Sequence, residues 1–212
     1  MIPARAIGLR CVVLGSLALA AVGCNGGATV AVKGDFPKPL IAPIPLHVGL
    51  VLDDALTSYV HDEEIKGLGH WHIEIGDLQR KLFRDIVPAM FANVSEVPSP
   101  QDAASVDGVL VPSIVDFQIS IPAQTRSDFY EVWIKYSIKL YDAGGTLVVE
   151  WPLTAYGKAR QGDYSVLKDK DRPGMQDATM TALRDAGAFM SLRFAQVPEV
   201  KKWLAEHTAE VN

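Results

Sequence analysis

The sequence predicts an α+β domain in two layers, a mainly antiparallel β-sheet with helices packed on one face. Three long segments of alternating apolar residues, 109–121, 132–140 and 147–155, predict a meander of antiparallel strands. The segment Asp-Ala-Gly-Gly at 142–145 joins the second and third strands and has the composition of a tight hairpin turn. Apolar residues at helical spacing on both sides of this meander predict helices that cover one of its faces.

Shorter elements complete the predicted domain. Asp77 is placed to cap the helix before the meander, and Pro88 is expected to kink that helix or to end its first half. Pro198 suits the first turn of the last helix. A polar connection is expected between the first two strands. The predicted elements outside the meander are strands at 47–52 and 71–75 and helices at 77–94, at 174–190 and from 198 onward.

Length and charge bound the number of domains and the kind of partner. The chain has 212 residues, of which 49% are hydrophobic and 21% charged, an ordinary balance for a globular protein. This length allows one well-cored domain, which we place at 47–212. Without the first 23 residues, which hold Arg5 and Arg10, the chain has 18 basic and 25 acidic side chains and a net charge of −7. A chain this acidic lacks the basic surface of a nucleic-acid-binding protein, and we expect no such partner.

The first 23 residues have the organisation of a signal peptide. Residues 1–10 carry two positive charges and no negative one, and 11–23 form a run of apolar and small residues. That run fits the apolar region of a signal peptide and is shorter than the about 20 residues that a membrane-spanning helix needs. We therefore predict that residues 1–23 are a cleaved leader.

The leader ends in Leu-Ala-Ala-Val-Gly-Cys at 19–24, which resembles the lipobox of bacterial lipoproteins. The resemblance implies that the Cys24 sulfur receives a diacylglyceryl group, that signal peptidase II cuts before Cys24, and that the new amino group is acylated. Ala21 stands where that family prefers leucine. Two or three acyl chains would anchor the protein in a membrane almost permanently, because a single chain binds only marginally. The alternative is an ordinary signal peptide, cut after 19–21.

Asn25 follows the predicted lipidated cysteine and bears on its destination. In enteric-type sorting an aspartate at this position retains a lipoprotein in the inner membrane, so the resemblance implies an outer-membrane lipoprotein that faces the periplasm. Cys11 leaves with the leader, so Cys24 is the only cysteine of the mature chain. No disulfide within one chain is therefore expected.

Residues 24–46 are rich in glycine and proline, unlike the domain that follows. Glycine gives flexibility and spaced prolines give stiff extension at about 3.1 Å per residue, so a tether could hold the domain up to roughly 60 Å from the membrane. The alternative is an extended arm that packs on the domain. Four apolar side chains could anchor such an arm: Phe36, Leu40, Ile41 and Ile44.

Candidate catalytic and metal-binding residues are few. His70 and His72 lie two apart on a predicted strand, with Glu74 next on the same face, and zinc accepts both imidazole and carboxylate ligands. Their spacing matches no specific metal motif, so a solvated strand face is the preferred interpretation and no metal or other cofactor is expected. Asp116 and Glu150 could meet across the sheet as a glycosidase pair, but a small meander supplies little of the necessary cleft. The sequence contains no G-x-S-x-G motif, and we predict no catalytic residues and no enzyme.

Two aromatic residues are candidates for a partner surface. Trp133 falls on the face of its predicted strand opposite to the apolar face that contains Ile134, and Tyr141 falls on the same face as Trp133. Aromatic side chains are enriched at protein interfaces. A second helix that covers both side chains is the alternative.

The order of elements resembles that of small periplasmic accessory lipoproteins, which serve envelope machines for polysaccharide export, curli secretion, lipopolysaccharide assembly and Tol-type functions. The resemblance rests on the strand at 48–52, the helix at 78–91, the meander at 109–156 and the helical end near 198–204. It implies a non-enzymatic accessory or scaffold of an envelope transport, secretion or assembly complex, with a protein partner or a second copy of the chain. A lipoprotein that binds a lipid or another small apolar ligand is the alternative, and a hydrolase is a further one.

Overall fold

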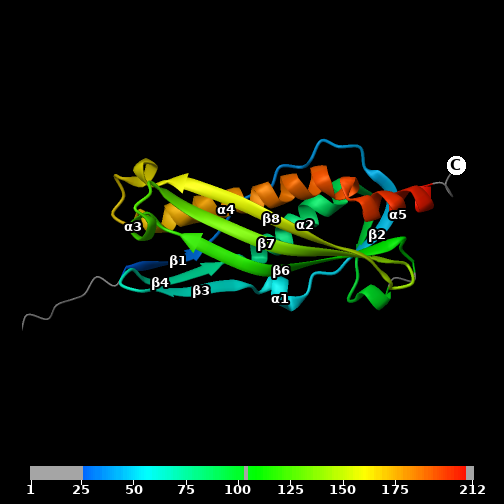
Figure 1. Cartoon of the computed structure of the whole chain (residues 1–212), viewed down its shortest axis with the longest axis horizontal. Coiled ribbons are helices and arrows are strands. Elements are labelled where there is room, and N and C mark those ends of the chain that lie inside the picture. The colour runs from blue at the N-terminus through cyan, green and yellow to red at the C-terminus, as the bar shows by residue number, and fades with distance from the viewer. Residues whose placement is uncertain (1–25, 103–104, 209–212) are drawn as a thin grey trace, which may run out of the picture.

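The computed structural model describes residues 26–102 and 105–208, which form an α+β fold with two mixed sheets (Figure 1). The predicted fold class is therefore confirmed, although the sequence did not predict that the strands divide between two sheets. In chain order the elements are β1 (Gly27–Ala31), β2 (Ile44–Leu50), α1 (Asp54–Thr57), β3 (Val60–Ile65), β4 (Gly69–Glu74), α2 (Gly76–Met90), β5 (Phe91–Glu96), β6 (Gly108–Ser120), α3 (Pro122–Thr125), β7 (Phe129–Asp142), β8 (Leu147–Arg160), α4 (Asp171–Arg193) and α5 (Pro198–Thr208).

The larger sheet has the strand order β5-β2-β6-β7-β8. Its β6, β7 and β8 pair antiparallel, which confirms the predicted meander. The predicted hairpin turn between β7 and β8 is also present. There the Asp142 carboxylate accepts the backbone N–H groups of Gly144 and Thr146 at 2.9 and 2.8 Å, and Gly145 takes a positive φ of 77°. These contacts explain why Asp and Gly occupy this turn.

The other half of the larger sheet is parallel, because β2 runs parallel to both β5 and β6. The predicted helix to residue 94 is wrong beyond Met90, since α2 ends there and β5 begins at Phe91. Phe91 is buried, so its place in the sheet outweighs the helical spacing that it continues. Asp77 does not cap α2 but lies in its first turn, and Pro88 lies two residues before the helix ends.

The smaller sheet has the order β1-β4-β3. Its central strand β4 was predicted, but β3 falls in the segment expected to be a polar connection, and that expectation is wrong. β3 pairs antiparallel with β4 from Val60 opposite Glu74 to Ile65 opposite Gly69. Of its side chains only Ile65 is buried, because β3 lies at the sheet edge with one face in solvent. An edge strand of this kind lacks the apolar alternation that identifies a strand from sequence.

Strand β1 corrects the predicted tether. Residues Gly27–Ala31 pair parallel with β4, and Val30 is fully buried. Gly27 adopts a φ of 104°, and a Cβ on it would lie 2.1 Å from the carbonyl oxygen of His70. The glycine is therefore required for close packing rather than for flexibility. From Gly27 onward the chain belongs to the folded body.

The segment between β1 and β2, residues 32–43, is an arm that runs along α4 (Figure 1). Phe36 is 7% exposed, and the Arg184 guanidinium of α4 donates two hydrogen bonds of 3.3 Å to the backbone carbonyl of Asp35. The packed arm, and not the free tether, thus describes this segment. Leu40 differs from the expectation, because it is fully exposed and does not anchor the arm.

Helices α2 and α4 cover one face of the larger sheet, as predicted (Figure 1). Helix α4 crosses β8 at Gly157, where a Cβ would lie 2.1 Å from the carbonyl oxygen of Ala178 and 2.2 Å from the amide of Ala182. The backbones of strand and helix are therefore in direct contact. The smaller sheet joins the larger one through Phe117 of β6, whose ring lies 4.8 Å from that of His61 on β3.

Candidate functional site

The predicted anchor and sorting residues, Cys24 and Asn25, lie outside the described residues. The described chain begins at Gly26, directly before β1. Within residues 26–102 and 105–208, no helix is both long and apolar enough to cross a membrane.

The two candidate metal-binding histidines lie on the solvent face of β4, together with carboxylates. Asp62 on β3 contacts both imidazoles, at 2.8 Å from Nδ1 of His72 and 3.3 Å from Nε2 of His70. Glu74 lies 3.2 Å from Nε2 of His72. The hydrogen bond to Asp62, supported by Glu74, raises the pKa of His72 above its ordinary value. In the part of the chain that the structure describes, no group of three or more side chains is arranged to hold a metal ion.

The candidate carboxylate pair does not meet. Asp116 on β6 lies opposite Lys135 on β7, whereas Glu150 on β8 lies opposite Lys139 and accepts a hydrogen bond of 2.6 Å from Ser137. Two strand spacings and four residues along β8 separate the two carboxylates, which is about 16 Å. A glycosidase pair needs a separation of no more than about 9.5 Å. These two residues therefore lack the geometry for glycoside hydrolysis.

The two aromatic residues predicted to form a partner surface lie on the same face of β7 but too far apart to form one surface. Trp133 is half-buried and lies against Tyr156 of β8 at a ring distance of 5.2 Å, on the face of the sheet opposite to that of the buried Ile134. Burial and a hydrogen bond to Glu131 raise the pKa of Tyr156 to about 12. Tyr141 is eight residues away, about 27 Å along the strand. It packs into a separate apolar cluster with Val51, Val106 and Val109.

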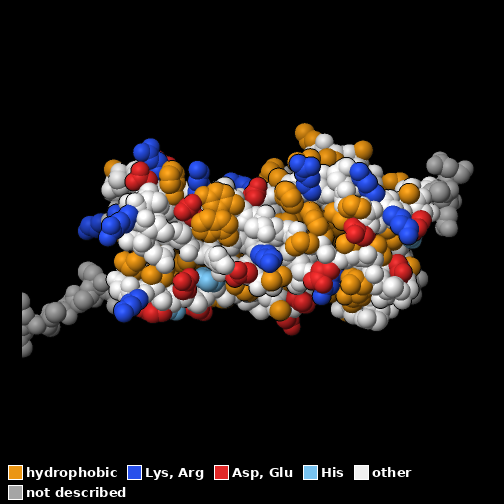
Figure 2. All heavy atoms as spheres, in the orientation of Figure 1, with side chains coloured by type: hydrophobic (Ala, Val, Ile, Leu, Met, Phe, Trp, Pro, Cys, Tyr) orange, Lys and Arg blue, Asp and Glu red, His pale blue; other side chains and the backbone are white. Residues whose placement is uncertain are grey.

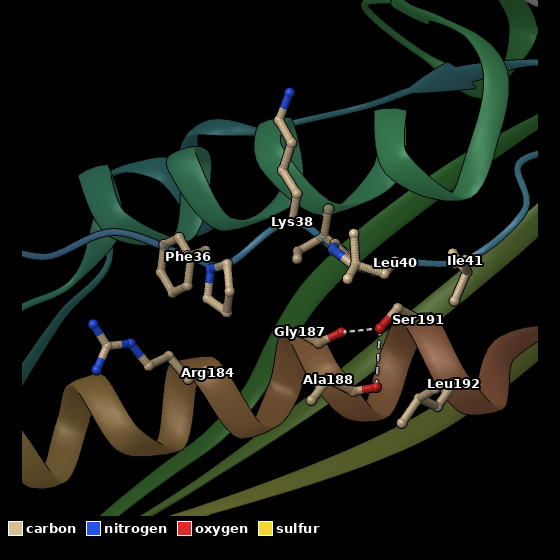
Figure 3. Close-up of a pocket in the computed structure, with 12 residues that line it drawn as sticks. Phe36, Lys38, Leu40, Ile41, Arg184, Gly187, Ala188, Ser191 and Leu192 are labelled. Atoms are coloured by element: carbon tan, nitrogen blue, oxygen red, sulfur yellow. Dashed lines mark hydrogen bonds between the residues drawn. The ribbon is translucent and has the colours of Figure 1, made fainter.

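A feature that the sequence did not reveal is an apolar groove of about 250 Å³ between the arm and α4 (Figure 3). Small residues on α4, Gly187 and Ala188, leave space beneath the arm. The Ser191 hydroxyl donates within its own helix, to the carbonyl oxygens of Gly187 and Ala188 at 2.9 and 3.0 Å. Its polar group is thereby satisfied, and the groove presents mainly apolar surface. Its lining residues are Phe36, Pro37, Lys38, Pro39, Leu40, Ile41, Ile86, Arg184, Gly187, Ala188, Ser191 and Leu192.

The groove has two properties of a binding site. Leu40 and Leu192 at its rim are 101% and 63% exposed, so a partner or ligand seated there would remove large apolar side chains from water. Lys38 and Arg184 add positive charge beside the groove, and the Lys38 side chain extends away from α4 (Figure 3). The groove therefore suits an apolar segment that carries negative charge nearby.

No family model and no curated protein matches the sequence. Among solved structures, a candidate lipoprotein from Caulobacter crescentus CB15 is 17% identical with a TM-score of 0.41, over 62% of this chain and 84% of that one. The hypothetical protein CT253 from Chlamydia trachomatis is 10% identical with a TM-score of 0.41, over 71% and 95%. A candidate homologue of neuraminyllactose-binding hemagglutinin from Helicobacter pylori is 11% identical with a TM-score of 0.49, over 81% and 96%. At these values the chain is assigned to no family.

Proposed function

We propose that this protein is a lipoprotein of the bacterial cell envelope, acylated on Cys24, whose domain acts by binding as an accessory of an envelope assembly or transport complex. The observation that carries the proposal is the leader, which ends in the lipobox-like residues 19–24 immediately before a folded body. A leader with a charged start and a short apolar run directs export, and a cysteine at its end is the acceptor for lipid.

Acylation is tested by metabolic labelling with palmitate in a bacterial host. The full chain and its Cys11→Ser variant are expected to incorporate label, because Cys11 lies in the leader that is removed. The Cys24→Ser variant is expected to incorporate none and to lose its membrane association. Label that persists in Cys24→Ser, or that is absent from the full chain, would contradict the proposal.

The outer membrane is the proposed destination, and Asn25 is the residue that tests it. In an enteric host, the full chain is expected in the outer-membrane fraction of a density gradient. The Asn25→Asp variant is expected in the inner-membrane fraction, because aspartate after the lipidated cysteine is the retention signal there. Equal distribution of the two chains would show that Asn25 does not direct sorting.

The proposal of binding rather than catalysis is supported by the groove and by the separation of the candidate carboxylates. We propose that the groove holds a segment of a protein partner in the envelope, or of a second copy of the chain. A photo-crosslinking residue at position 40 is expected to give one adduct of defined mass in cells, and twice the chain mass would identify a second copy. Val115 is a matched control, since it is exposed but lies on β6, outside the groove. An absent adduct at position 40, with a monomer in mild detergent, would refute this part.

A second candidate function is the binding of a small apolar ligand, which the apolar lining of the groove favours. Native mass spectrometry of the chain extracted from membranes would then show a mass beyond that of the covalent acyl groups. Ala188→Leu is expected to abolish this extra mass, because the larger side chain occupies the groove. A chain without extra mass would exclude this candidate and leave the protein partner.

A further inference from the structure

One end of the domain gathers three connections around the start of the described chain (Figure 1). They are the β3–β4 turn, the α3 segment between β6 and β7, and the connection between β8 and α4. Gly26 lines a common cavity of about 300 Å³ with Leu68, Pro122, Gln161 and Lys170, which come from all three connections. A Cβ on Gly69 would lie 1.4 Å from the carbonyl oxygen of Gly26, so the two backbones are in direct contact. Gly26 is therefore fixed at this end of the domain.

The covalent chain sets how far this end can lie from the predicted anchor. Only one residue separates Cys24 from Gly26, and two Cα steps span at most about 7 Å. The polar region of each leaflet is itself several ångströms thick, roughly 5–8 Å. If Cys24 carries lipid, Gly26 must lie at or next to the headgroup layer. The packed β1 thus removes the distance that a free tether would have provided.

The connection between β8 and α4 exposes apolar side chains at this same end. Val166 is 91% exposed and Leu167 is 47% exposed, and they are followed by Lys168, Asp169 and Lys170. Exposed apolar residues next to lysines are typical of segments that enter a membrane interface, where the apolar groups leave water and the ammonium groups meet headgroup phosphates.

The charge at this end differs from that of the rest of the chain. The mature chain has a net charge of −7, but the three connections carry four basic and three acidic side chains. Figure 2 shows both blue Lys and Arg and red Asp and Glu side chains at this end of the molecule. The repulsion that an acidic domain would meet at an anionic surface is therefore absent here. The four cations are Lys66, Arg126, Lys168 and Lys170.

We infer that this end is a membrane-contacting surface. It places Val166 and Leu167 among the lipid headgroups, and the long axis of the domain then points away from the bilayer. The inference rests on the proposed acylation of Cys24. In this orientation the β7–β8 hairpin lies at the end far from the membrane, because β8 spans about 40 Å from Arg160 to Leu147. The groove on the second half of α4 lies about 20–30 Å from the bilayer, within reach of a periplasmic partner.

The test uses the full acylated chain with one added cysteine, in vesicles of phosphatidylethanolamine and phosphatidylglycerol at three to one. Cys11 leaves with the leader and the Cys24 sulfur is acylated, so an added cysteine is the only free thiol. An environment-sensitive fluorophore is attached to Val166→Cys or, as a control at the opposite end, to Leu147→Cys; the two side chains are 91% and 46% exposed, so both positions can be labelled. The fluorophore at 166 is expected to lose more than half its emission to nitroxide-labelled lipid, and the fluorophore at 147 to keep its full emission.

Three outcomes overturn the inference. They are no quenching at position 166, equal quenching at both positions, and protection of 166 in cells without quenching in vesicles, which would indicate a protein that covers this end. A failure of the proposed acylation is visible separately. The chain without an added cysteine would then react with a thiol reagent at Cys24 and would lack the mass of the acyl groups.

Discussion

Phe36 and Leu40 lie four residues apart in the same arm and differ completely in burial, at 7% and 101% exposed. Truncation of a buried phenylalanine to alanine costs about 3–5 kcal/mol. Because the arm lies at the edge of the core, next to an open groove, we expect the lower value for Phe36→Ala, about 3 kcal/mol. For a domain of this size each kcal/mol lowers Tm by about 2–4 °C, so Tm should fall by about 6–12 °C. Leu40→Ala removes a side chain that touches water alone, and its free energy of unfolding should change by less than about 0.5 kcal/mol.

The assay is thermal unfolding followed by circular dichroism, with urea unfolding as a second measure of the free energy. The two variants form a matched pair, because a free tether would make both neutral and a packed arm separates them. Hydrogen exchange adds a local readout, since Phe36→Ala should lower the protection of amides that the arm covers. Equal melting temperatures for the two variants and the unaltered chain would refute the packed arm and restore the tether.

Two further predictions concern packing and charge. Gly157→Ala should destabilise the domain by about 1–3 kcal/mol in urea unfolding, because a Cβ there would lie 2.1 Å from the α4 backbone, whereas Gly162→Ala should be nearly neutral, because its nearest neighbour would be 3.9 Å away. The His72 imidazole should titrate above its ordinary pKa of 6.5 in an NMR titration and should return toward it in Asp62→Asn. Because the folded pKa of His72 is raised, its stabilising contribution is present below 6.5 and is lost as the pH rises through the folded value.

The elements that the sequence predicts are those whose pattern is local. The meander alternates over three long strands, and its hairpin turn carries Asp142 and Gly145 at the positions that the turn requires. Strands β1 and β5 lack such a pattern, since each is defined by a partner distant in sequence. Strand β3 pairs with its neighbour β4 but lacks the pattern because most of its side chains face solvent. In the sequence Gly27 resembles a linker residue, and only the structure shows that it packs against the backbone of His70. Phe91 continues the apolar spacing of the preceding helix, and only the structure shows that it pairs with β2.

The candidate sites also depend on contacts between residues distant in sequence, which local patterns do not predict. The alternation of residues along β7 predicts that Trp133 and Tyr141 lie on the same face, and the structure confirms it. Alternation does not show that the two side chains belong to separate surfaces. The groove unites the arm and α4, whose contact between Asp35 and Arg184 joins residues 149 positions apart. No spacing within the sequence relates two such segments. Only the small residues of α4 and the exposed Leu40 give a local signal, and both are also typical of ordinary helix and loop surfaces.

The prolines of the arm have a different role from the one that a tether would give them. The arm joins β1, at the end next to the predicted anchor, to β2, toward the other end of the domain, and it runs along α4 without a strand partner (Figure 1). Proline has no backbone N–H that needs such a partner, and its fixed φ reduces the entropy that is lost when the arm becomes ordered. Prolines therefore stabilise an extended segment where no sheet can. The same segment forms one wall of the groove, so the residues that suggest flexibility in the sequence hold a candidate binding surface in place.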